Sequence, residues 1–369
     1  MQELRERIDA IDDAILDLIE QRARTAEEVG RVKQSSGRSM HDPEREQRIF
    51  ERLEKKHADG GNVFPRSSLR PVFREIISAC LSMEQEVTVS YLAPPGTFTH
   101  MAALAAFGLS ARYVEAASIA GVFDAVTRKS TQYGVVPIEN STEGGVTFTL
   151  DSLLDSSLMI RNELVLDVSQ CLIGRHAELA RIQRVYSHPQ GLAQCRHWLA
   201  KNLPTAQLVV SNSTSAAARE AAADDASAAV ASRLAAEIHG LTVIREGIQD
   251  RPRNATRFIV LAEHDAPPTG RDKTSLVFST PDERGALKRT LEIFEDERIN
   301  LTRIESRPGA GALWEYVFFT DLEGHRTDPP LARALERLEG LCRMVKVLGS
   351  YPRFVGEETP EPSSQAAAP

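Results

Sequence analysis

The hydrophobic positions at the start of the chain recur with helical spacing. Between residues 2 and 32 the apolar side chains follow one another in steps of four and three, and neither glycine nor proline interrupts them before Gly30. These side chains are Leu4, Ile8, Ile11, Ile15, Leu18, Val29 and Val32. One long amphipathic helix is therefore expected. It would extend about 45 Å, longer than so small a segment can cover by folding back on itself, which predicts a homodimer or higher homo-oligomer.

Two further helices complete this first region. Asp42 and Pro43 combine an N-cap residue with proline at the first helical position, which predicts a helix that continues through Leu53. A third helix is expected from about residue 68 to residue 85. Its buried stripe reads Phe73, Ile77, Cys80 and Glu84. We therefore expect an all-α domain over residues 1–86.

From Val87 onward, short apolar runs alternate with helical patterns, which is typical of α/β structure. The runs in residues 87–263 are too many for one lobe, so a two-lobed α/β domain of the periplasmic-binding-protein kind is expected, with a cleft between the lobes. Residues 263–272 have the Pro and Gly content of a linker. Residues 273–351 follow the β-α-β-β-α-β order of a ferredoxin-like fold. Residues 355–369 lack apolar periodicity and should be disordered.

Composition narrows the classes of function. The net charge is −8 and no tract is strongly basic, so neither nucleic acid nor an anionic membrane surface is an expected partner. No apolar run approaches the roughly 20 residues of a membrane helix, and the N-terminus does not resemble a signal peptide. The four cysteines are far apart, which argues against a metal site and a disulfide scaffold. Small-molecule ligands and a cytoplasmic location are expected.

Charged residues interrupt the apolar stripes of the helical region. Arg22 follows Leu18 by four residues, and Lys33 lies 33 − 22 = 11 residues further on, about three helical turns. Glu84 is the matching charge on the third helix. Charges in such positions are costly unless they are paired. Either Arg22 and Glu84 form a buried ion pair, or the charges line an anion pocket inside the bundle.

Three segments of this region carry a family resemblance: LRERIDAIDDAILDLIEQRARTAEEVGRVK, HDPEREQRIFERL and FREIISACLSMEQ. Residues 3–86 resemble the all-helical chorismate mutases. The resemblance implies a site made of Arg5, Arg22, Lys33, Asp42, Glu46, Cys80 and Glu84. Arg22, with Arg5 from the partner subunit, would bind the two carboxylates of chorismate, and Lys33 would donate to the ether oxygen. A pericyclic rearrangement needs no nucleophile, so catalysis would consist of clamping the substrate and stabilising charge.

Asp42, Cys80 and Glu84 allow a second interpretation. Asp42 and Glu46 would hold the substrate hydroxyl and Lys33, although Asp42 also fits the role of a helix cap. Cys80 and Glu84 stand where some members of the family have Ser and Gln, while others carry Glu. A carboxylate donates to an ether oxygen only when it is protonated, and burial raises its pKa.

Residues 87–263 contain the segments YLAPPGTFTH, VVPIENSTEGG, VYSHPQ, NSTSAA and NATRF, which resemble those of the prephenate dehydratases. Several are turns rich in glycine and hydroxyl groups before predicted helices, where backbone N–H groups bind carboxylates, although each alone would also serve as an ordinary N-cap. The resemblance makes Thr256 the proton donor to the leaving hydroxyl. It assigns substrate binding to Thr97, Asn140, Ser141, Gln190, Ser213, Thr214 and Arg257. His188 is expected to be structural, and Ala93 replaces a usual glycine.

The last unit contains RGAL at residues 284–287 and NLTRIESRP at residues 300–308. These segments resemble the signatures of the phenylalanine-binding members of the ACT family. The implied effector residues are Gly285, Ala286, Leu287, Asn300, Leu301, Glu305, Ser306, Arg307 and Pro308. Gly285 would let the backbone approach an amino acid closely. A structural turn at Gly285 and a surface charge pair of Glu305 with Arg307 remain the alternative.

Together these resemblances imply a fused chorismate mutase and prephenate dehydratase. It would convert chorismate to prephenate and then to phenylpyruvate, without a cofactor and under feedback inhibition by phenylalanine. A dehydratase that prefers arogenate and a non-catalytic amino-acid-sensing binding protein remain alternatives. A mutase fused to a prephenate dehydrogenase is excluded, because no glycine-rich dinucleotide turn follows a strand.

Overall fold

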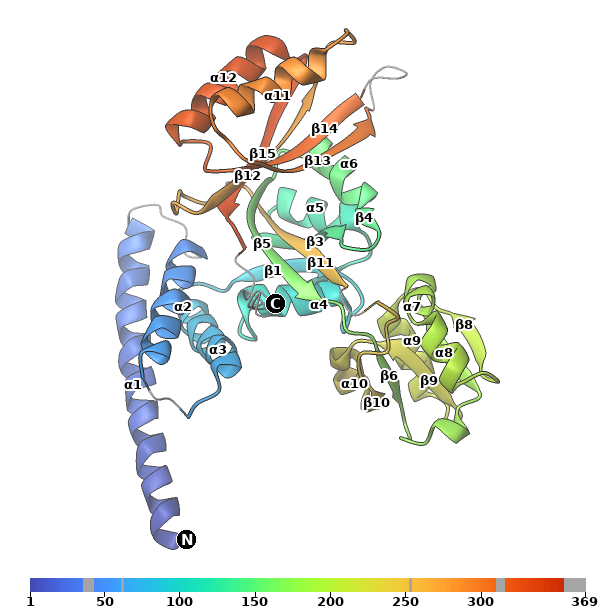
Figure 1. Cartoon of the computed structure of the whole chain (residues 1–369). Coiled ribbons are helices and arrows are strands. Elements are labelled where there is room, and N and C mark those ends of the chain that lie inside the picture. Colours follow the sequence, from blue (N-terminus) through green and yellow to red (C-terminus); the bar gives the residue numbers. More distant parts are fainter. Residues whose placement is uncertain (36–42, 61–62, 252–253, 310–315, 355–369) are drawn as a thin grey trace, which may run out of the picture.

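The computed structural model describes residues 1–35, 43–60, 63–251, 254–309 and 316–354. The tail predicted to be disordered, residues 355–369, and the candidate residue Asp42 lie outside the described residues. A helical unit, two α/β lobes and a C-terminal sheet unit follow one another along the chain (Figure 1). No helix in the described part of the chain combines the length and hydrophobicity that crossing a membrane requires.

The helical unit consists of α1 (Gln2–Ser35), α2 (Pro43–Ala58) and α3 (Arg66–Glu84), as predicted. α1 extends far beyond the other two helices (Figure 1). Its apolar stripe is largely exposed, with 56% of Ile8 and 64% of Leu18 accessible to solvent. An apolar stripe of this length on a surface is typical of a contact with another chain.

The first lobe contains a mixed sheet in the order β2-β1-β3-β11-β5, with the short β4 paired to β3. β1 is parallel to β2 and β3, whereas β11 is antiparallel to β3 and β5. The strands are β1 (Thr88–Leu92), β2 (Arg112–Ala116), β3 (Tyr133–Asn140), β4 (Gly144–Gly145), β5 (Met159–Asp167) and β11 (Ala255–Ala262). The helices are α4 (Phe98–Phe107), α5 (Ile119–Thr127) and α6 (Thr147–Asp155).

The second lobe is built on a sheet in the order β10-β6-β9-β7-β8. The chain enters it after β5 and returns to the first lobe at β11, so two crossings join the lobes, as expected for a binding-protein-like fold. Its strands are β6 (Cys171–Gly174), β7 (Arg184–Ser187), β8 (Gln207–Val210), β9 (Ser227–Ala231) and β10 (Thr242–Arg245). Its helices are η1 (Leu179–Arg181), α7 (Pro189–Gln194), α8 (Arg196–Asn202), α9 (Thr214–Ala222) and α10 (Arg233–His239).

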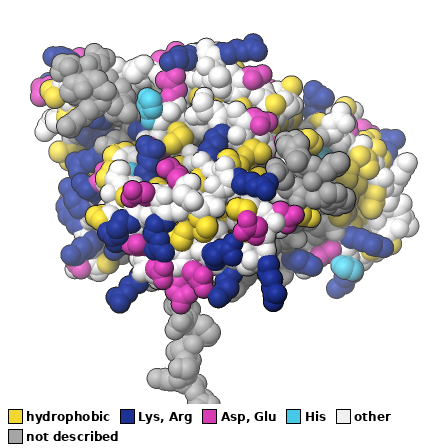
Figure 2. Space-filling view, turned by 90° about the horizontal axis from the view of Figure 1, so that it is seen from above, with side chains coloured by type: hydrophobic (Ala, Val, Ile, Leu, Met, Phe, Trp, Pro, Cys, Tyr) yellow, Lys and Arg dark blue, Asp and Glu magenta, His cyan; other side chains and the backbone are white. Residues whose placement is uncertain are grey.

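The C-terminal unit has the predicted β-α-β-β-α-β order. Its elements are β12 (Asp272–Ser279), α11 (Ala286–Asp296), β13 (Leu301–Pro308), β14 (Tyr316–Glu323), α12 (Pro329–Leu341) and β15 (Met344–Pro352). The antiparallel sheet has the order β13-β14-β12-β15 and carries both helices on one face (Figure 1). Seen from this end of the molecule, basic and acidic side chains are intermixed over the surface (Figure 2).

The other face of this sheet packs on the first lobe and shares a hydrophobic core with it. The cluster joins Ile138 and Ile160 of the lobe to Val277 and Phe319 of the C-terminal unit. Gly349 of β15 lies against the backbone of Ile160, where an added Cβ would collide with main-chain atoms. The lobe and the sheet unit are therefore rigidly joined, because neither can separate without exposing shared core.

Candidate active sites and effector site

A cavity of about 400 Å³ opens between the three N-terminal helices. Five predicted residues line it: Arg22 and Lys33 from α1, Glu46 from α2, and Cys80 and Glu84 from α3. Helical spacing explains the convergence, because residues one or three turns apart project from nearly the same face. The structure thus brings together five of the residues implied for the first site.

Two buried polar atoms of these side chains have no hydrogen-bond partner. They are Nη1 of Arg22 and Oε2 of Glu84. The buried ion pair that the sequence left open is therefore not formed at these atoms. Buried polar groups are almost always bonded, and an unpaired one costs free energy. Both residues line the cavity, so these two atoms are candidates to bind a polar ligand there.

Glu84 lies directly against α1. A Cβ added at Gly30 would come within 2.8 Å of Cγ of Glu84, so glycine makes room for this side chain in the middle of a helix. Burial raises the pKa of Glu84 above its ordinary value, although the charges of Lys33 and Arg22 oppose the shift. The shift is toward the protonated carboxyl, which is the form that can donate a hydrogen bond.

The cavity also contains two arginines that the sequence reasoning missed, Arg45 and Arg52. Both belong to α2, a helix so rich in charge that the pattern does not separate cavity-facing side chains from solvated ones. Arg5, in contrast, does not line the cavity. It is exposed near the outer end of α1 and lies 22 − 5 = 17 residues before Arg22, about 25 Å along the helix.

In the first lobe, Thr256 and Asn140 face each other on the paired strands β11 and β3. Nδ2 of Asn140 donates to Oγ1 of Thr256 at 2.9 Å and to Oδ1 of Asn254 at 3.0 Å. Oδ1 of Asn140 accepts from the backbone N and Oγ1 of Thr142 at 2.9 and 2.6 Å. Because the amide donates to Thr256, the threonine hydroxyl keeps its own proton available for another acceptor.

The second lobe reaches this pair through α7. Oε1 of Gln194 accepts from Nδ2 of Asn254 at 3.1 Å, and Nε2 of Gln194 approaches Oε1 of Glu143 at 3.4 Å. Gln190, the predicted residue, precedes Gln194 by one helical turn and projects from the same face of α7. On the first lobe, Oγ of Ser141 accepts from the backbone N of Ala255 at 3.0 Å. Gln194 was missed because it lies beyond the recognised motif, although its i+4 spacing from Gln190 was a usable signal.

Two of the predicted turns begin helices with side-chain caps, whereas the turn at residues 141–145 contains β4, and α6 follows Val146 without a side-chain cap. Oγ1 of Thr97 accepts from the backbone N of His100 at 3.3 Å at the start of α4. Oγ of Ser213 accepts from the backbone N of Ala216 at 2.9 Å, and Thr214 is the first residue of α9. His188 caps α7, the structural role expected of it. Side-chain capping leaves other first-turn N–H groups to bind an anion, so the two roles are compatible.

Three regions of the chain each match the model of a known protein family. Family models of "Chorismate mutase type II", "Prephenate dehydratase" and "ACT domain" match residues 4–85, 89–266 and 274–340. The bifunctional chorismate mutase/prephenate dehydratase of Aquifex aeolicus is 45% identical over 97% of this chain and 99% of its own length. The chain belongs to the bifunctional chorismate mutase/prephenate dehydratase family. It has both activities and functions in phenylalanine biosynthesis.

Two further similarities support this assignment. The bifunctional chorismate mutase/prephenate dehydratase of Pseudomonas aeruginosa is 41% identical over 96% of this chain and 98% of its own length. The crystal structure of the prephenate dehydratase from Arthrobacter aurescens, in complex with L-Phe, is 38% identical. It covers 72% of this chain and 90% of its own, with a TM-score of 0.67.

Arg257 requires a correction, because it does not join Thr256 in the dehydratase cleft. Successive residues of a strand point to opposite faces, and its guanidinium points toward the ACT domain. It donates to Glu163 at 2.7 Å, to Asp321 at 2.5 Å and to the Tyr351 hydroxyl at 2.8 Å. Although burial opposes ionisation of Asp321, the Arg257 charge holds the pKa of Asp321 below its usual range. Arg257 therefore links two domains rather than contacting substrate from this position.

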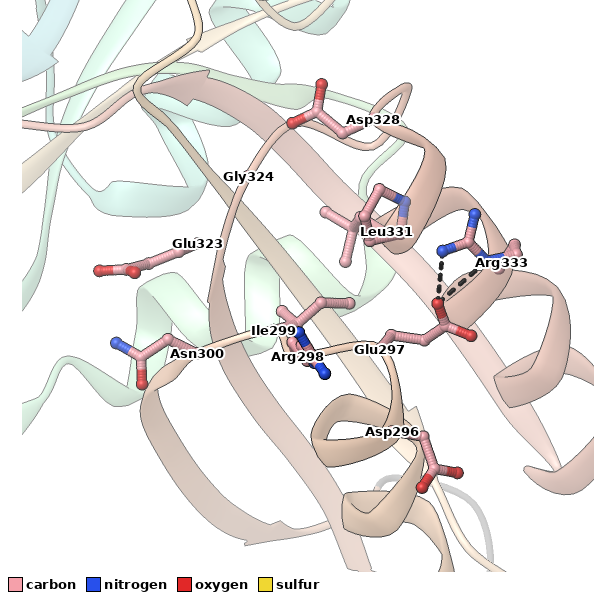
Figure 3. A pocket seen from close by; sticks show the side chains of 11 residues that line it. Asp296, Glu297, Arg298, Ile299, Asn300, Glu323, Gly324, Asp328, Leu331 and Arg333 are labelled. Carbon is pink, nitrogen blue, oxygen red and sulfur yellow. Dashed lines mark hydrogen bonds and ion pairs between the residues drawn. The ribbon is translucent and has the colours of Figure 1, made fainter.

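The predicted effector residues are divided between the two ends of the ACT domain. Gly285 adopts a left-handed conformation, with φ of 80°, and begins α11. Asn300 follows the other end of this helix, whose 11 residues span about 16 Å. Asn300 lines a charged cavity of about 550 Å³ that does not include Gly285 (Figure 3). Within one chain the two signatures therefore do not meet. Ala286 is buried, and Leu287 and Leu301 pack against the ACT core.

Glu305 and Arg307 also require a correction. Both lie on the side of β13 that faces the first lobe: Nη1 of Arg307 donates to the carbonyl of Thr147 at 2.9 Å. A Cβ added at Gly145 would collide with the Glu305 carboxylate. Glu305 pairs with Arg303 and Arg307 pairs with Asp151, so the surface pair between Glu305 and Arg307 is not formed. Ser306 and Pro308, between and beyond them, are exposed.

Proposed function

We propose that the cavity between α1, α2 and α3 is the chorismate mutase site. Arg22 binds a substrate carboxylate, while Lys33 and protonated Glu84 donate to the ether oxygen as its bond to carbon breaks. Arg45 and Arg52 add positive charge suited to a dianion. The two unpaired atoms of Arg22 and Glu84 carry this proposal. Nη1 of Arg22 suits an anionic oxygen, and Oε2 of Glu84, when protonated, suits an ether oxygen.

We also propose that Thr256 delivers the proton in the dehydratase cleft. The carboxylate carbon of prephenate leaves as CO₂, its bonding electrons complete the aromatic ring, and the ring hydroxyl departs as water after taking a proton. Asn140 holds the Thr256 oxygen as a hydrogen-bond acceptor, which directs the hydroxyl proton outward. Gln190, Ser141 and the helix-start turns at Thr97 and Ser213–Thr214 would bind the substrate around it.

A homodimer or larger assembly would complete the mutase site. The exposed stripe of α1 gives the surface for a second copy, and Arg5 reaches a mutase cavity only if the partner's helix runs alongside. β13 is an edge strand of the ACT sheet, with a side unpaired among the described residues. A second ACT domain there would bring Gly285 of one chain toward Asn300 of the other, and phenylalanine would bind between them as the feedback inhibitor.

A reducing compartment, the cytoplasm, fits this enzyme, because all four cysteines are free. The decisive experiment is a two-substrate assay with purified enzyme. Chorismate should yield phenylpyruvate through prephenate, prephenate added directly should be converted, and phenylalanine should inhibit the second step. A higher kcat/KM for arogenate than for prephenate would favour the arogenate alternative, whereas ligand binding without turnover would favour the binding-protein alternative.

A further inference from the structure

Helix α3 serves two domains at once. One face lines the mutase cavity through Ile77, Cys80 and Glu84. The other face packs on the dehydratase domain at the end of α4. There Oγ of Ser78 donates to the carbonyl of Phe107 at 2.7 Å, and Gly108 leaves so little space that an added Cβ would lie 2.5 Å from Cβ of Ser78. The joint between the domains is therefore tight.

Arg74 lies at this joint and contacts both sides. Its guanidinium forms an ion pair with Glu46, one of the mutase-cavity residues, and Nη1 also donates to the carbonyl of Ala106 at 3.1 Å. The guanidinium carbon sits 4.8 Å from the centre of the Phe50 ring. Only 9% of the Glu46 side chain and 22% of the Arg74 side chain are exposed. A carboxylate this buried needs a cationic partner to keep its charge and direction.

The carbonyl of Ala106 belongs to the last turn of α4, the helix whose first turn is capped by Thr97 at the dehydratase cleft. A cation at a helix C-terminus is favoured by the helix dipole, which adds to the hydrogen bond. α4 is about 15 Å long. Arg74 therefore connects a mutase-site carboxylate to a rigid element whose other end borders the second active site.

We propose that Arg74 is a positioning residue of the chorismate mutase reaction. By holding Glu46 against the anchored end of α4, it fixes the carboxylate that orients Lys33 and the substrate hydroxyl. The mutase site thus depends on the dehydratase domain for its geometry. This inference rests on the proposed role of Glu46 in the mutase site.

Arg70 provides a matched control, because it lies one turn earlier on α3. It also stacks over Phe50, at 5.3 Å, but it pairs with Glu54, which does not line the mutase cavity. No hydrogen bond from Arg70 to the dehydratase domain is found among the described residues. Loss of either arginine removes a cation from the same helix and the same ring, yet only Arg74 holds a mutase residue.

The test compares Arg74→Met, Arg74→Lys and Arg70→Met in the full-length enzyme. Arg74→Met should lower mutase kcat/KM on the order of tenfold to a hundredfold, the range expected when a catalytic group is misplaced. Arg74→Lys should recover most of it, and Arg70→Met should stay within about twofold of wild type. Dehydratase turnover of added prephenate and the midpoint of thermal unfolding verify that each variant is folded.

Glu46→Gln separates failure of this inference from failure of the mutase assignment. If Glu46→Gln lowers mutase activity, adding Arg74→Met should cost little more, because the two residues act as one unit. Fully additive losses, or an Arg74→Met enzyme no slower than Arg70→Met, would overturn the positioning role and leave the role of Glu46 intact. A Glu46→Gln enzyme with wild-type mutase activity would overturn both.

Discussion

The mutase and dehydratase regions differ in how completely one chain buries its apolar residues. In α1 of the mutase region, 56% of Ile8 and 49% of Ile15 are exposed, whereas Ile138 and Leu150 of the dehydratase region are 2% and 0% exposed. Because the dehydratase region buries its apolar residues within one chain, its lobes need no second chain to form their candidate site. The open stripe leaves apolar area on α1 that a second copy of the chain would cover in the proposed assembly.

The two sites also differ in their polar chemistry. At the mutase cavity, buried atoms of Arg22 and Glu84 have no hydrogen-bond partner, whereas Asn140, Asn254 and Thr256 form a hydrogen-bonded network of neutral groups. A rearrangement of a dianion needs fixed charges around the substrate, and loss of water needs one proton placed with accuracy. In the proposed assignment the two catalytic sites share no residue.

Single substitutions should separate the two activities. Lys33→Ala should lower mutase kcat on the order of 10²–10³-fold, as for loss of a donor to a developing negative charge, and should leave conversion of added prephenate unchanged. Thr256→Ala should lower the dehydratase rate by roughly 10²–10⁴-fold and spare the mutase. Initial rates with each substrate measure both. Loss of both activities in a folded single variant would show that the sites are not independent.

Regulation should act through backbone geometry in the ACT domain. Gly285→Ala forces an L-residue into a left-handed conformation, so phenylalanine should bind more weakly by about 5- to 150-fold, the usual range of allosteric couplings. Calorimetry and inhibition curves should shift together. Gly270→Ala is the control, because that linker glycine has a similar φ of 86° with open space around it. Equal shifts in both variants would mean that strain alone, not the effector site, is responsible.

A smaller effect is expected from pH. In the proposed mechanism the protonated form of Glu84 is the donor, and burial raises the pKa of this carboxyl, so the mutase rate at saturating chorismate should fall as pH rises through that pKa. Glu84→Gln, which donates at every pH, should flatten this limb without altering the dehydratase profile. Because the native chain keeps a proton that the unfolded chain releases, the free energy of unfolding should also fall across this window. A level wild-type profile would leave Glu84 only an orienting role.

Much of the fold and several candidate site residues could be predicted from the sequence, because hydrophobic periodicity and sequence motifs indicate local structure. Arg22 and Glu84 stood out as charges on apolar stripes, and both lie in the cavity. Motif resemblance placed Asn140 and Thr256 together, and they are hydrogen-bonded. Helical periodicity fixes the face on which Arg22 and Glu84 lie, whereas the pairing of Asn140 with Thr256 followed from the family resemblance and not from local geometry.

What the sequence did not reveal depends on contacts between distant segments. Arg257 lies next to Thr256 in the sequence but points to the opposite face of β11. There its guanidinium binds Asp321 and Tyr351, which follow it by 64 and 94 residues in the sequence. Likewise, the helical pattern of α3 does not distinguish Arg74 from Arg70. The roles of such side chains depend on which domain packs against which face of their helix or strand. Local hydrophobic periodicity contains no information on that packing.

In the proposed assembly the mutase site is built from two chains and the dehydratase site from one. Arg5→Ala and Arg22→Ala enzymes, each inactive as a mutase, should recover about a quarter of wild-type mutase activity when equal amounts are unfolded, mixed and refolded. Half of the dimers are then hybrids, each with one intact site of two. Dehydratase activity should be the same in every sample. No recovery, with hybrid dimers verified by mass spectrometry, would contradict the shared site.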